Sequence, residues 1–239
     1  MHRDYVKWYS PSLGRDMEAL VFGHAGARVL VFPTSMGRFY EWEDRGMIAA
    51  LADVIERGWF QLLCVDSVDA DSWYAKWKHP NHRARHHEAY DRYLEHELVP
   101  YTAHRNPNPF LVVTGASFGA YHAATFAFRH PHLVGRLLGM SGLYDIKQQT
   151  DGYSDEAVYF ANPTDFVQHE HDAGRLEAMR RIDIIIAVGR DDPNVADNQR
   201  FSHLLWQKGV PHALRLWDGW AHDWPWWREM VKIYIHGHD

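Results

Sequence analysis

Ser117 lies between two glycines, Gly115 and Gly119, which stand two residues before it and two residues after it. The spacing Gly-x-Ser-x-Gly is typical of a nucleophilic serine at a sharp turn between a strand and a helix. At such a turn the serine backbone is strained and its hydroxyl projects above the sheet. The two flanking positions then crowd one another and leave no room for a Cβ atom. Because glycine is common, the same letters also arise by chance, and the neighbouring sequence must decide.

The neighbouring sequence fits a strand, a turn and a helix. The apolar run Phe-Leu-Val-Val at 110–113 precedes the turn, and residues 118–129 have helical spacing that ends before Pro131. The Phe118 amide would then lie at the helix N-terminus, where an N–H group and the helix dipole stabilise a negatively charged oxygen. We therefore predict that Ser117 is a nucleophile and that the Phe118 amide is one donor of an oxyanion hole.

A serine hydroxyl is a weak nucleophile, so it needs a basic histidine and a carboxylate that orients this histidine. In a sheet of this kind the chain order is serine, acid, histidine, and the last two lie in loops after later strands. His222 follows the strand-like run at 212–217 and is the predicted base. Asp192 follows Gly189 in a short turn, just before a proline, and is the predicted acid.

Two other aspartates remain open as the acid. Asp191 is the chain neighbour of Asp192, and it would be the acid if the loop turns the Asp191 side chain inward. Asp145 follows an earlier strand-like run, and some hydrolases of this kind place the acid there.

Aromatic side chains gather near His222 and after the strand-like run 59–67. Trp220 precedes His222 by two residues, and Trp73 and Tyr74 belong to a segment that faces the same end of the sheet. We predict that these three side chains line the substrate pocket. The tryptophans at 224–227 begin the last helix, and we predict that they pack it on the sheet.

His82 and His86 stand four residues apart on one face of a predicted helix, a spacing that can bind a metal ion. No His-Glu-x-x-His motif and no matching set of cysteines accompanies them, so we interpret them as part of a polar helix face. The sequence also contains no phosphate-binding loop and no dinucleotide fingerprint. We therefore predict no metal ion and no cofactor.

Apolar runs of strand length alternate with segments of helical period. This alternation predicts an α/β fold on a mostly parallel, doubly wound sheet with helices on both faces. The first two runs flank a short turn and are predicted to form an N-terminal antiparallel hairpin. The predicted strands are 19–23, 28–35, 59–67, 110–115, 136–142, 182–189 and 212–219, and the predicted helices are 44–57, 81–103, 118–129, 195–208 and 224–235.

The chain of 239 residues shows no internal repeat and no linker, so we predict one domain over 1–239. Residues 145–180 are polar without a strand-like run, and we predict that they form a cap-like excursion over the sheet edge.

The net charge is −6 without a long run of Lys or Arg, which argues against nucleic acid binding. No apolar run reaches the roughly 18 residues of a membrane span. The first residues lack the apolar core of a secretory signal, so we expect a cytoplasmic protein.

Several longer segments carry a family resemblance. They read HHEAYDRYLEHELVPYTAHR, TGASFGAYHAATFAFRHPHLVGRLLGMSGLYD, VGRDDPNVADNQRFSHLLWQKGVPHALRLWDG and AHDWPWWREM. Through them the chain resembles the putative-esterase family of α/β-hydrolases, which includes esterase D (S-formylglutathione hydrolase), enterochelin esterases and mycolyltransferases. The resemblance covers most of the chain. It implies the α/β-hydrolase fold and acyl-ester chemistry at Ser117, with His222 as the base and an aspartate within 189–192 as its partner.

The resemblance also implies that a second oxyanion amide lies just after the third strand of the fold. Relatives often carry His-Gly there, but this chain has Phe32-Pro33. Because Pro33 has no N–H to donate, the Thr34 amide is the first choice and the Ser35 amide is the second.

These residues together predict a serine esterase that cleaves small-molecule carboxylic esters through an acyl-enzyme, without a cofactor. An acyltransferase would use the same acyl-enzyme with an alcohol in place of water. A catalytically silent binding module on the same fold is the alternative from another class. The acyl group, the alcohol and the oligomeric state stay open.

Overall fold

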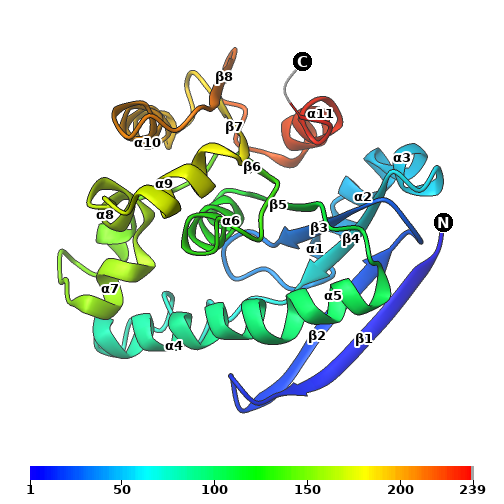
Figure 1. Ribbon diagram of the computed structural model, residues 1–239, viewed down its shortest axis with the longest axis horizontal. Helices are drawn as coiled ribbons and strands as arrows, with labels where there is room; N and C mark the ends of the chain where they lie inside the picture. The colour runs from blue at the N-terminus through cyan, green and yellow to red at the C-terminus, as the bar shows by residue number, and fades with distance from the viewer. Residues whose placement is uncertain (238–239) are drawn as a thin grey trace.

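An eight-stranded sheet forms the centre of the structure, with the strand order β1-β2-β4-β3-β5-β6-β7-β8 (Figure 1). The computed structural model describes residues 1–237. All neighbouring strands from β4 to β8 in this order are parallel, and only β2 runs against its neighbours. The strands are β1 (Arg3–Ser10), β2 (Arg15–Phe22), β3 (Ala27–Phe32), β4 (Phe60–Val65), β5 (Leu111–Ala116), β6 (Arg136–Met140), β7 (Asp183–Gly189) and β8 (Ala213–Trp217).

The central strands are apolar on both faces because helices cover both faces. In β3, Leu30 and Phe32 point into one apolar cluster, whereas Val29 and Val31 point into another. The first cluster includes residues of α4 (Pro80–Tyr93), α6 (Phe118–Arg129), α8 (Pro163–Gln168) and α10 (Val195–Gln207). The second includes residues of α2 (Met47–Ala50), α3 (Ala52–Glu56) and α11 (Trp224–Tyr234). This arrangement explains the continuous apolar runs of the sequence.

The N-terminal hairpin is present, but its strands differ from the predicted ones. β1 pairs with β2, whereas the prediction paired 19–23 with 28–35. Instead, β2 lies against β4, and β3 lies between β4 and β5. The side chains of β1 alternate between exposed and half-buried, as expected for a strand at the edge of a sheet. In β1 the apolar Val6 and Trp8 alternate with polar residues, so this strand lacks the continuous apolar run on which the strand predictions are based.

The predicted helix over 44–57 is divided into α1 (Glu41–Asp44), α2 and α3. Gly46, with a φ of 74°, separates the first two. The predicted helix over 81–103 is formed by α4, a π-helical segment at Leu94–Leu98 and α5 (Val99–Arg105).

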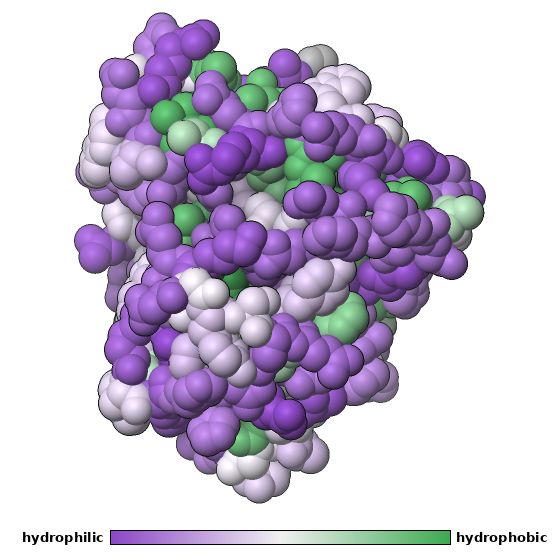
Figure 2. All heavy atoms as spheres, turned by 90° about the vertical axis from the view of Figure 1, so that its left-hand side faces the viewer, coloured by the Kyte–Doolittle hydropathy of each residue, from purple (hydrophilic) through white to green (hydrophobic). Residues whose placement is uncertain are grey.

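The stretch 145–180 contains a 3₁₀ turn at Ile146–Gln149, α7 (Glu156–Ala161), α8 and α9 (Ala173–Arg180). Within it, α7 packs against α4, and α8 packs against α6 and α10. The side of the molecule on which α7 and α8 lie is mostly hydrophilic, with small separated hydrophobic areas (Figure 2). The division into one domain with a cap-like excursion stays a prediction.

Both ends of the described chain lie on the side of the sheet at which the parallel strands begin, opposite to the side at which they end. Arg3 pairs with Phe22, which in turn pairs with Leu62 near the start of β4. At the other end, the Ile235 carbonyl accepts a hydrogen bond of 2.7 Å from Nη1 of Arg136, the first residue of β6. Within residues 1–237, no helix has the length and apolar character needed to cross a membrane.

Candidate active site

Ser117 occupies a strained turn between β5 and α6. Its φ of 54° and ψ of −121° lie in a region that residues with a side chain rarely adopt. A Cβ at Gly115 would collide with the backbone of Gly119, and a Cβ at Gly119 would lie 2.5 Å from the Phe32 carbonyl oxygen. The structure thus gives the physical reason for glycine at both positions. The turn leaves Ser117 half-buried, and within residues 1–237 its Oγ makes no hydrogen bond.

The loops after β7 and β8 bring Asp192 and His222 together. His222 Nδ1 lies 3.0 Å from each carboxylate oxygen of Asp192. The Asp192 side chain is completely buried, whereas 18% of the His222 side chain is exposed. The Asn194 amide also donates a hydrogen bond of 2.7 Å to Asp192 Oδ1, so this carboxylate is held on two sides.

The two other candidate acids lie in different environments. Asp191 is exposed to solvent. Asp145 caps the 3₁₀ turn by accepting a hydrogen bond of 3.1 Å from the Lys147 amide and one of 3.0 Å from Asn162 Nδ2. Neither carboxylate is hydrogen-bonded to His222 in this structure, which favours Asp192 as the partner of His222.

Backbone contacts join these two loops directly. The Arg190 amide donates to the Trp217 carbonyl at 2.8 Å, and the Asp191 amide donates to the Gly219 carbonyl at 3.0 Å. A side chain at Gly189 would collide with the backbone of Trp220. Glycine at the end of β7 therefore lets the loop that carries His222 lie against the loop that carries Asp192.

Ser141, at the end of β6, links this region to the last helix. Trp227 Nε1 donates to Ser141 Oγ at 3.1 Å, and Ser141 Oγ donates to the Ala221 carbonyl at 3.4 Å. Ser141 and Ala221 both have positive φ values, 51° and 47°. The Trp227 ring packs edge-on against His222, with ring centroids 5.2 Å apart. Strained backbone thus gathers around His222, as it often does at functional sites.

The two predicted oxyanion amides differ in their surroundings. Phe118 is the first residue of α6, and in the described chain its N–H has no hydrogen-bond partner. The Thr34 amide donates to Glu41 Oε2 at 2.8 Å, and Thr34 Oγ1 donates to Oε1 at 2.7 Å. Within the described residues the Ser35 amide has no such partner. The Ser35 amide is therefore free to donate, whereas the Thr34 amide is already engaged.

Comparison with protein families identifies the chain. The family model described as "Putative esterase" matches residues 27–233. The chain belongs to this esterase family. The resemblance seen in the sequence is confirmed, and the protein is a carboxylic ester hydrolase. A search of curated protein sequences finds no match.

Solved structures of other hydrolases share the fold of this esterase. A ferulic acid esterase has 18% sequence identity and a TM-score of 0.79, over 98% of this chain and 96% of that one. An S-formylglutathione hydrolase from Agrobacterium tumefaciens has 13% identity and a TM-score of 0.76, over 98% and 93% of the two chains. A fluorophosphonate-binding serine hydrolase of Staphylococcus aureus has 15% identity and a TM-score of 0.69, over 98% and 97%. These likenesses confirm the predicted α/β-hydrolase fold.

Two of the three predicted pocket side chains lie beside the site of the esterase. The Trp220 ring lies 5.7 Å from the His222 ring, and 53% of Trp220 is exposed. Tyr74 is half-buried, packs edge-on against Phe118 at 5.5 Å and donates from its hydroxyl to Ser35 Oγ at 2.7 Å. These contacts place Tyr74 next to both oxyanion candidates.

Trp73 does not line an open pocket, which corrects the prediction. It is completely buried and belongs to an apolar cluster with Phe118 and Tyr121. Successive residues of a loop point in different directions, and here the chain turns Tyr74 toward the site and Trp73 into the core. Trp73 therefore supports Phe118 and α6 by packing.

His82 and His86, which were interpreted as part of a polar helix face, lie in different environments. His82 is exposed, whereas His86 is half-buried, and this burial lowers the pKa of His86. Among residues 1–237 no group of three or more His, Cys, Asp and Glu side chains is arranged to hold a metal ion.

Sequence reasoning missed Ser141 and Asp69, two polar residues near the site. Ser141 lies at the end of the predicted strand 136–142 and Asp69 follows the predicted strand 59–67, at the end of the sheet where functional residues gather, and this position was their only signal. Asp69 is completely buried and contacts the Met36 amide and the His122 ring.

Proposed function

We propose that this esterase hydrolyses its substrates through a Ser117, His222 and Asp192 triad and an acyl-enzyme intermediate. The observation that carries the proposal is the pair of 3.0 Å contacts between His222 Nδ1 and a buried Asp192. Ser117, Asp192 and His222 follow β5, β7 and β8, which are parallel. The carboxyl ends of parallel strands meet at one edge of the sheet, so this topology supports a common site.

In the proposed reaction, His222 Nε2 accepts the Ser117 hydroxyl proton as Oγ attacks the ester carbonyl carbon. His222 Nδ1–H donates to Asp192, whose charge stabilises the imidazolium that forms. The imidazolium then gives its proton to the leaving alcohol, and the acyl group stays on Ser117. Water attacks this acyl-enzyme with His222 again as the base, and the carboxylic acid leaves.

The negative charge that develops on the carbonyl oxygen needs two nearby N–H donors. We assign them to Phe118 and Ser35, and the contact between Thr34 and Glu41 supports Ser35 over Thr34. Trp220 is exposed and His222 is partly exposed, so the site is open to solvent. This openness favours water, and not an alcohol, as the acyl acceptor.

Covalent labelling tests the nucleophile. A fluorophosphonate probe should modify Ser117 in the wild-type protein, as located by peptide mass spectrometry, and should leave Ser117→Ala unlabelled. The same variant should lose on the order of 10³-fold or more in kcat on p-nitrophenyl esters while its circular dichroism stays unchanged. Near-normal hydrolysis by Ser117→Ala would rule out the proposed mechanism.

A further inference from the structure

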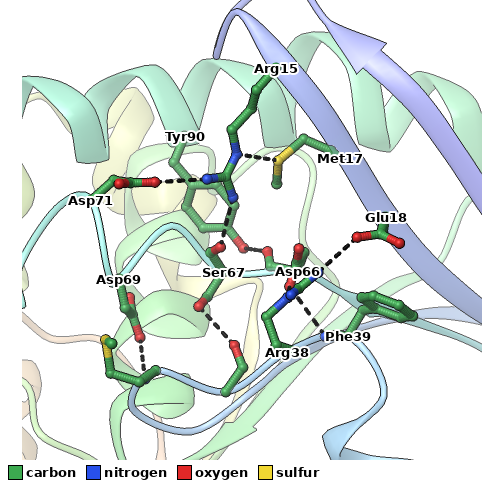
Figure 3. Close-up of polar contacts among 12 residues, drawn as sticks. Arg15, Met17, Glu18, Arg38, Phe39, Asp66, Ser67, Asp69, Asp71 and Tyr90 are labelled. Carbon is green, nitrogen blue, oxygen red and sulfur yellow. Dashed lines mark hydrogen bonds and ion pairs between the residues drawn. The ribbon is translucent and has the colours of Figure 1, made fainter.

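Asp69 is a buried carboxylate with two different partners. It lies in the loop after β4, and its side chain and that of His122 are completely buried. Oδ2 of Asp69 accepts a hydrogen bond of 3.0 Å from the Met36 amide, a contact drawn in Figure 3. Oδ1 lies 2.9 Å from His122 Nε2. Asp69 thereby connects the loop after β3 with helix α6.

The loop after β3 needs external support. Met36, the neighbour of Ser35, has a φ of 60°, a left-handed conformation that is unfavourable for a residue with a side chain. Half of Met36 is exposed, so apolar packing contributes little to this conformation. Its amide is held by Asp69 instead.

The segment that contains Asp69 holds this loop at further points (Figure 3). Ser67 Oγ donates to the Gly37 carbonyl at 2.9 Å, and Arg38 Nε donates to Asp66 Oδ1 at 2.6 Å. Of these contacts, the one from Asp69 lies nearest in sequence to Ser35.

The other partner, His122, belongs to the start of α6. It stands five residues after Ser117, and its ring packs edge-on against Phe118 at 5.1 Å. On its other side the ring lies 6.1 Å from Phe32, at the end of β3. The Asp69–His122 pair therefore spans the two elements that carry the oxyanion candidates.

We propose that Asp69 is a positioning residue that fixes the Ser35 amide relative to the Phe118 amide. The proposal rests on the proposed function, because it concerns the oxyanion hole of that site. Oxyanion donors act through preorganisation: they must already point at the place where negative charge develops. Burying a carboxylate and a histidine is a poor way to gain stability, and a pair of this kind is better explained by the geometry that it imposes.

Asp69→Asn tests the role because it keeps the shape and can still accept from Met36, but presents an amide group to His122. We expect kcat on p-nitrophenyl acetate to fall about 10- to 100-fold with KM almost unchanged. A trifluoromethyl ketone, which forms an oxyanion adduct with the serine, should bind more weakly by a similar factor. Asp71→Asn is the matched control, since Asp71 lies in the same loop but pairs with Arg15 at the surface, and it should behave as wild type.

His122 supplies a second, independent variant in case Asp69→Asn fails to fold. His122→Phe keeps the ring but removes the donor and should reproduce the loss, whereas His122→Gln can donate to Asp69 and should restore part of kcat. The proposal is overturned if folded Asp69→Asn or His122→Phe keeps kcat and ketone affinity within about twofold of wild type. It is also overturned if only KM changes. An inactive Ser117→Ala beside a fully active Asp69→Asn would refute this inference alone, whereas an active Ser117→Ala would refute the proposed function.

Discussion

Asp191 and Asp192 are chain neighbours in opposite surroundings. Asp192 is buried against His222, whereas Asp191 is exposed. In the proposed mechanism, Asn at position 192 keeps the shape but removes the charge that stabilises the imidazolium, and it favours the wrong tautomer of His222. We expect Asp192→Asn to lower kcat by about 10²–10⁴-fold and Asp191→Asn to leave it nearly unchanged. Steady-state kinetics of both variants on p-nitrophenyl acetate measure this difference.

Circular dichroism should show both aspartate variants folded. The reverse pattern of activity would make Asp191 the acid. If neither substitution matters, the acid belongs elsewhere, and Asp145 is then the next residue to replace.

Trp220 is the exposed aromatic ring nearest to His222 among the predicted pocket residues. If it contacts the acyl chain, Trp220→Ala should lower kcat/KM on long p-nitrophenyl esters more than on the acetate, since each buried methylene contributes roughly 0.8 kcal/mol. Trp206→Ala is the control, because Trp206 is 64% exposed and packs against His212 instead. A chain-length profile that Trp220→Ala leaves unchanged would remove this ring from the pocket.

Local sequence favours Ser117, Asp192 and His222 because each lies in the turn or loop that follows an apolar run of the sheet. The sequence could not show that the Thr34 amide is already bonded, since that requires knowing that Glu41 folds back onto it. Nor could it separate Trp73 from Tyr74, because the burial of Trp73 depends on Phe118 and Tyr121, which are distant in sequence.

At the scale of elements, α6 packs so closely on β3 that Gly119 meets the strand end. An alanine Cβ there would lie 2.5 Å from the Phe32 carbonyl oxygen and 2.6 Å from that of Pro33. Gly119→Ala should therefore push apart the two elements that carry the proposed oxyanion amides. We expect about a tenfold or greater loss of kcat and a loss of about 1–3 kcal/mol in the free energy of unfolding.

Kinetics and urea denaturation measure the two effects of Gly119→Ala. Gly174→Ala in α9 is the control, because its Cβ would meet only the Asp172 side chain, at 3.3 Å. If Gly119→Ala is as active and as stable as Gly174→Ala, α6 and β3 can move apart to accommodate the added Cβ without affecting the site.

The parallel strands could be predicted because burial on both faces leaves an unbroken apolar run. The pairing of the N-terminal strands could not. Two apolar runs joined by a short turn resemble a hairpin, yet β4 enters between β2 and β3 from later in the chain. Because β4 comes from later in the chain, no feature of residues 19–35 themselves shows that it lies between β2 and β3.

For the molecule as a whole, the proposed reaction needs no Lewis acid. Incubation with EDTA should leave the rate of p-nitrophenyl acetate hydrolysis unchanged, and added zinc should not raise it. A loss with EDTA that zinc restores would contradict this expectation. His82 and His86 would then be the first residues to replace.

The positions of the chain ends have a practical consequence. Arg3 and Ile235 lie where the parallel strands begin, whereas Ser117, Asp192 and His222 follow the ends of those strands. A tether attached beside Arg3 or Ile235 would therefore hold the protein on a bead or an electrode with the loops that carry Ser117, Asp192 and His222 turned toward the solution. Oriented immobilisation of this esterase therefore requires no redesign of its surface, only a choice between these two attachment points.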